Sequence, residues 1–126
     1  MKLSEITSHA VTLPLQGGGS LAVVQVAAVP EAARGFTWDR GAGQYVVCIN
    51  ADLPDEQKAR TFLHEVSHVV LGHFEHIATT TGQEQEADDR AALLFRLWLQ
   101  GGTSPELELL NQWTEKRGQV VPLRVS

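Results

Sequence analysis

Two histidines four residues apart, in the run His64-Glu65-Val66-Ser67-His68, constrain this chain more than any other feature. On an α-helix, residues at this spacing lie on the same face, so both imidazoles can bind one metal ion. In hydrolases with this spacing, neutral ring nitrogens hold zinc, and the glutamate between them takes a proton from the water that the metal activates. The run therefore predicts a helix, a metal site and a hydrolytic reaction.

A catalytic zinc ion takes three protein ligands and keeps one position open, so a third ligand must come from elsewhere in the chain. The candidates that follow the motif are Glu84, Glu86, Asp88, Asp89, His73 and His76. If the helix continued, His73 would lie about 140° round from His68 and point away from the metal, so we interpret it as a helix-end residue. His76 is interpreted as a surface residue or an indirect contact. Helical periodicity does not choose between Glu84 and Glu86.

Length and composition indicate one soluble domain over residues 1–126, with 43% apolar and 20% charged residues. The net charge of −5, without clustered Lys or Arg, argues against direct nucleic-acid binding. The one cysteine, Cys48, excludes an internal disulfide and lies in an apolar run typical of a buried strand. Neither a signal peptide nor a membrane-spanning stretch is recognisable, so we expect a cytoplasmic protein without membrane contact.

The apolar patterns predict a short strand before Gly17, followed by two antiparallel strands, Leu21 to Val29 and Gln44 to Asn50, with turn residues between them. A helix capped by Asp52 should carry the motif and end at Gly72.

Two further helices should run over residues 83–100 and from Ser104 to near residue 118, before a tail that can add an edge strand. The fold class is therefore α+β, a small antiparallel sheet packed on the motif helix, with the next helix supplying the third ligand. Trp38, Trp98 and Trp113 are interpreted as core or interface residues.

The chain resembles the ImmA/IrrE-like metallopeptidases over roughly Leu21 to Phe95. The resemblance rests on the following matching stretches: Val23 to Pro30, Arg34-Gly35-Phe36, Tyr45 to Pro54, Phe62 to His73, Glu86-Ala87-Asp88 and Ala91-Ala92. In that family a Glu-Ala-Asn element opens the helix after a zincin-like active-site helix, and its glutamate is the third ligand. By position this residue is similar to Glu86, so the resemblance implies that Glu86 is the third ligand beside His64 and His68.

Three departures from the family pattern keep a rival assignment open. Asp88 stands for the usual Asn, Arg90 stands for an aromatic residue, and a proline that commonly ends the helix is missing. The rival makes Glu84 the ligand and Asp88 its supporting residue.

The resemblance implies a zinc-dependent cytoplasmic endopeptidase that cleaves a specific protein, such as a DNA-binding repressor. Mn²⁺ and Fe²⁺ are alternatives to Zn²⁺ because availability as well as affinity decides which metal is bound. The sequence also allows a module that keeps the metal-site fold but acts by binding a partner. A third alternative is a structural metal site closed by a fourth ligand, His76 or Asp88. The oligomeric state is not readable from the sequence.

Overall fold

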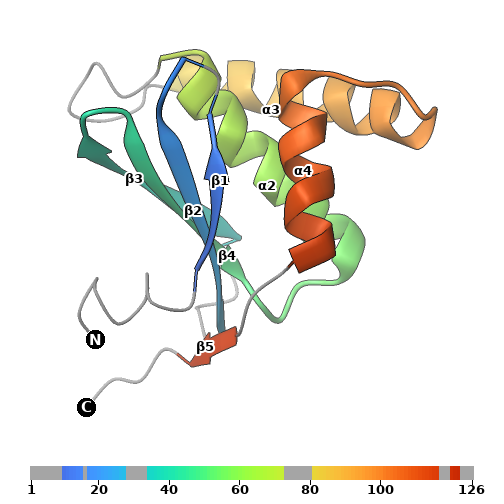
Figure 1. Ribbon diagram of the computed structural model, residues 1–126. Coiled ribbons are helices and arrows are strands. Elements are labelled where there is room, and N and C mark those ends of the chain that lie inside the picture. Colours follow the sequence, from blue (N-terminus) through green and yellow to red (C-terminus); the bar gives the residue numbers. More distant parts are fainter. Residues whose placement is uncertain (1–9, 16, 28–33, 73–80, 117–119, 123–126) are drawn as a thin grey trace.

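The structure, a computed structural model, describes residues 10–15, 17–27, 34–72, 81–116 and 120–122. Its strands are β1 (Val11–Pro14), β2 (Ser20–Ala27), β3 (Gly35–Gly41), β4 (Gln44–Asn50) and β5 (Val120–Pro122). The order across the sheet is β1-β2-β4-β3, and the short β5 pairs with β2. Figure 1 shows α2 (Asp55–Val70), α3 (Thr81–Leu99) and α4 (Pro105–Lys116) on one side of this sheet. The α+β class predicted from the sequence is confirmed.

The sheet is mixed, so the predicted antiparallel pairing of its two strongest strands is wrong. β2 and β4 are parallel, with Val23 opposite Val47, whereas β1 pairs antiparallel with β2 and β3 antiparallel with β4. The reason lies in residues 34–43, which the sequence indicated as turns. They form the extra strand β3 and a tight turn in which Gly41, Ala42 and Gly43 all have positive φ. This added reversal turns β4 parallel to β2.

The main core lies between the sheet and the helices. Its two largest fully buried side chains stack on each other, Phe62 on α2 against Trp113 on α4, with ring centroids 5.2 Å apart and planes 7° from parallel. Both side chains are completely buried. Trp113, interpreted from the sequence as a core or interface residue, is a core residue, and the stack holds α4 against the helix that carries the motif.

The helix ends agree with the sequence in part. Gly72, with φ 72°, follows the last turn of α2, and Ser104 caps α4 by accepting a hydrogen bond from the Leu107 amide at 3.1 Å. Asp52 does not cap α2, which begins after Pro54 without a side-chain cap. Instead, the Asp52 amide donates to Asn50 Oδ1 at 2.9 Å, so it closes the turn that leaves β4.

The opposite face of the sheet carries a second buried cluster, Val24, Val26, Val46 and Cys48. Cys48 is 2% exposed, as expected for a core residue. Burial, with the nearby Glu65 carboxylate adding to it, raises the pKa of the Cys48 thiol to about 12. The thiol is therefore neutral and unsuited to act as a nucleophile or ligand.

Strand β3 leaves no room for a side chain at Gly35, where it lies against both β4 and α2. A Cβ at this position would lie 2.6 Å from the Cys48 carbonyl oxygen and 2.8 Å from Thr61 Cγ2. Only glycine fits without a shift of the backbone. Among the described residues, none of the helices has the length and apolar composition needed to cross a bilayer.

Candidate metal centre

Two neighbouring helices supply three side chains whose potential ligand atoms converge. His64 and His68 lie one turn apart on α2, and Glu84 comes from the first turns of α3. The Nε2 atoms of the two histidines are 3.1 Å apart. Glu84 spans them, with Oε2 3.1 Å from His64 Nε2 and Oε1 3.2 Å from His68 Nε2. One possible ligand atom from each residue lies within 4.8 Å of the others.

This donor set fits a divalent metal. Two ligands on a tetrahedral zinc ion with bonds of about 2.0–2.1 Å are about 3.3 Å apart, close to the three separations above. Two imidazoles and one carboxylate are also a common set of protein ligands for catalytic zinc. His68 is buried, whereas Glu84 is about half exposed, so the cluster opens toward solvent on the α3 side.

Glu65 lies beside the cluster and is held by the sheet. The residue is 6% exposed, and its Oε1 accepts a hydrogen bond from Thr37 Oγ1 on β3 at 2.9 Å. Its Oε2 is 3.8 Å from His64 Nε2. Burial raises the pKa of Glu65 and the Glu84 charge adds to this, while the Thr37 hydrogen bond and His64 oppose it. The arrangement suits a carboxylate that exchanges a proton.

Asp88 contacts the other nitrogen of His64. Its Oδ1 is 2.7 Å from His64 Nδ1, although the direction of approach is not that of a well-formed hydrogen bond. A carboxylate behind a metal-binding histidine fixes the ring orientation and raises its basicity. Glu84 and Asp88 are one turn apart on α3, the same spacing as His64 and His68 on α2.

The model of the IrrE N-terminal-like domain, peptidase family M78, matches residues 22–103. The chain belongs to this family. The match includes both helices of the candidate site, β3, β4 and all but the first two residues of β2. No curated protein and no solved structure matches the chain at a significant level.

In this M78 domain, some of the predicted site residues lie in the cluster and one does not. His64, His68 and Glu65 lie together, as the motif predicted. The Glu86 side chain is exposed and is not a member of the group. Two residues along a helix are about 200° apart in direction, so Glu84 and Glu86 cannot both face α2. The geometry favours the rival pair, Glu84 and Asp88.

Other residues considered from the sequence are placed as follows. His73 and His76 lie outside the described residues. Asp88 contacts the far nitrogen of His64, so it does not close the cluster as a fourth ligand. Thr37 was missed, because a threonine in a region predicted to be a turn gives no signal. The pair Glu84 and Asp88 had a signal, its one-turn spacing.

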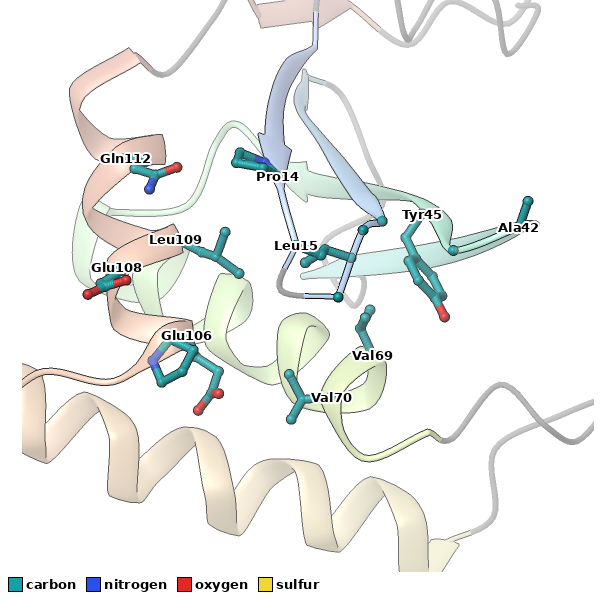
Figure 2. Close-up of a pocket in the computed structure, with 15 residues that line it drawn as sticks. Pro14, Leu15, Ala42, Tyr45, Val69, Val70, Glu106, Glu108, Leu109 and Gln112 are labelled. Atoms are coloured by element: carbon teal, nitrogen blue, oxygen red, sulfur yellow. The ribbon is translucent and has the colours of Figure 1, made fainter.

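The M78 domain also has a cavity of about 600 Å³ away from these donors, shown in Figure 2. The β1–β2 turn, the end of α2 and the start of α4 line it, through residues such as Leu15, Val70 and Leu109. Tyr45 closes one side. The residues that line it do not include His64, His68, Glu65 or Glu84, so the cavity is not the metal centre.

Proposed function

We propose that this M78 domain is a metal-dependent endopeptidase that cleaves a specific protein substrate. The observation that carries the proposal is the convergence of His64, His68 and Glu84 within ligand distance of one another, beside a buried carboxylate. Zn²⁺ is the metal that this donor set suits best, and Mn²⁺ or Fe²⁺ would occupy the same ligands. That the substrate is a repressor and that the protein works in the cytoplasm both stay predictions.

A metal ion held by these residues would polarise the scissile carbonyl and make water more acidic. Glu65 would take the proton of the attacking water at Oε2, the oxygen that faces His64, and deliver it to the leaving amine. Thr37 would hold the other oxygen through its hydrogen bond, so that Glu65 keeps one orientation during both transfers. Asp88 would keep His64 turned toward the ligand cluster.

The edge of β3 is the proposed place for the substrate backbone. β3 lies at the end of the strand order in the described sheet. The Arg34 carbonyl accepts a hydrogen bond from the Asn50 amide, and hydrogen-bonded pairs alternate along an antiparallel ladder. Gly35 and Thr37 therefore turn their backbone groups away from β4. A peptide paired with them would run beside Glu65, which Thr37 contacts.

The test compares wild-type protein with Glu65→Gln after loading with Zn²⁺, using a mixture of random octapeptides and mass spectrometry of the products. We expect wild type to cleave, and Glu65→Gln to be slower by about a thousandfold, because it cannot accept the proton. Calorimetry should show the same zinc affinity for both proteins.

The matched control is Glu56→Gln, which alters an exposed glutamate on the same helix and should leave the rate unchanged. Full cleavage by Glu65→Gln would overturn the mechanism. Wild-type protein that binds zinc and cleaves nothing would instead favour the partner-binding module.

A further inference from the structure

Strand β3 has a second face with a different chemistry. Thr37 points toward α2, so its neighbours Phe36 and Trp38 point to the opposite face of the sheet. Their rings pack edge to face with centroids 5.0 Å apart. They are 39% and 37% exposed, and they are the exposed aromatic side chains among the large apolar residues that the structure describes.

Phe36 and Trp38 lie next to the second core cluster, at the edge of the sheet. Across the β3–β4 ladder, Phe36 is opposite Cys48 and Trp38 is opposite Val46, and both partners belong to the second core cluster. The two rings thus lie opposite residues of a packed core and are partly exposed to solvent. Partly exposed aromatic side chains are typical anchors of protein interfaces, because they offer a large contact area and have only two side-chain torsions to order on binding.

The position of the pair relates it to the reaction. A peptide that extends the sheet at β3 presents successive side chains alternately to the two faces. Side chains on one face would lie over Thr37, Glu65 and the metal ligands. The intervening side chains would lie on the face of Phe36 and Trp38, within reach of the rings as cross-strand neighbours.

We propose that Phe36 and Trp38 form an apolar subsite that selects the substrate. The preferred substrate is an extended segment with apolar side chains at every second position, alternating with those that face the metal centre. This inference rests on the proposed endopeptidase function and deepens it, because it assigns specificity to the strand that holds Glu65 rather than to the metal site itself.

The test uses two octapeptide mixtures. One has Leu, Phe or Val at every second position and Ser or Thr elsewhere, and the other has only Ser and Thr. Zinc-loaded wild type should cleave the alternating mixture about fivefold faster. Phe36→Thr and Trp38→Thr are chosen because threonine suits a strand. Each should reduce the ratio of the two cleavage rates to nearly one. Leu93→Thr, which removes a 64% exposed leucine from α3, is the matched control and should retain the preference.

A second measurement does not need cleavage. In the zinc-loaded Glu65→Gln variant, the alternating mixture should slow hydrogen exchange at the outward amides of Gly35 and Thr37. In the double variant Glu65→Gln and Trp38→Thr, the same mixture should not slow it. An unchanged preference in both threonine variants, or no slowing at these amides, would overturn the subsite.

The two proposals fail in different ways. If wild type cleaves both mixtures equally, the endopeptidase stands and the subsite is wrong. If wild type cleaves neither mixture, the endopeptidase function fails, and the exchange measurement alone decides whether β3 and its aromatic pair bind a peptide.

Discussion

The two sides of α2 differ in what holds their neighbours in place. Toward α4 the contact is dry and aromatic, with Phe62 stacked on a fully buried Trp113. Toward the first half of α3 the facing groups are His64, His68 and Glu84, and Ala87 is the one buried residue between Thr81 and Arg90. One side therefore depends on excluded water and the other on polar groups that a metal can join. A single helix thus serves as both core element and site.

The largest effect should come from the aromatic side. Trp113→Ala removes the stacked partner of Phe62 and should lower the free energy of unfolding by about 3–5 kcal/mol, measured by urea denaturation. The loss should be the same with and without zinc, because α4 does not contribute a ligand. Trp98→Ala, at a partly exposed position on α3, is the control and should cost less than half as much. If Trp113→Ala lowered the free energy of unfolding only in the zinc-loaded protein, the aromatic side would not be independent of the metal site.

On the polar side, Glu84→Ala should weaken zinc binding by about a hundredfold to a thousandfold, because one of three ligands is lost. Glu86→Ala is the matched control, two residues away and exposed, and should change the affinity by less than about twofold. Calorimetry on metal-stripped protein measures both. The reverse order of effects would restore Glu86 as the ligand.

These two sides also differ in how far the sequence predicts them. Apolar spacing, helix-forming composition and end signals were enough to predict α2, α3 and α4 and to indicate that Trp113 is a core or interface residue, because these features depend on side-chain type. The histidine spacing predicted the α2 half of the site for the same local reason. The third ligand was assigned to Glu86 on the family resemblance alone, whereas the structure brings Glu84 to the two histidines. Local patterns do not settle this choice, because the direction in which α3 faces α2 depends on packing between helices.

The sheet shows a similar limit. Each of the apolar strands was predicted, but their relative direction depended on whether residues 34–43 were a loop or a strand. Gly35, Gly41 and Gly43 gave this segment the composition of a turn, although most of it pairs with β4. Thr37 could not be assigned a role until that pairing placed it 2.9 Å from Glu65.

A smaller effect should come from the ion pair that links α3 to α4. Arg90 Nη2 lies 3.0 Å from Glu106 Oε2, and the Glu106 side chain is 5% exposed. Arg90→Met would leave this carboxylate buried without its partner and should cost about 2 kcal/mol, less than a fully buried pair because Arg90 is partly exposed. Arg96→Met, on an exposed position of α3, should be nearly neutral. Equal losses in thermal unfolding for the two variants would show that the pair does not stabilise the fold.

The smallest effect should come from the residue behind His64. Asp88→Ala removes the contact to Nδ1 and should weaken zinc binding by about tenfold, at the low end for such supporting carboxylates because Asp88 is exposed. Asp89→Ala, whose carboxylate contacts Gln85 instead, should leave the affinity unchanged. If the two variants bind zinc equally well, Asp88 does not orient His64.

At Gly35, strand β3 has no space for even one additional carbon atom. The missing side chain of this glycine lets β3 approach α2 closely enough for Thr37, two residues further along, to contact Glu65. One added methyl group would act as a wedge and move the strand outward, which would withdraw the Thr37 hydroxyl from Glu65 and displace the strand edge that we propose the substrate uses. Proton transfer and substrate alignment would thus be lost together, although the metal ligands, the base Glu65 and its partner Thr37 were all unchanged.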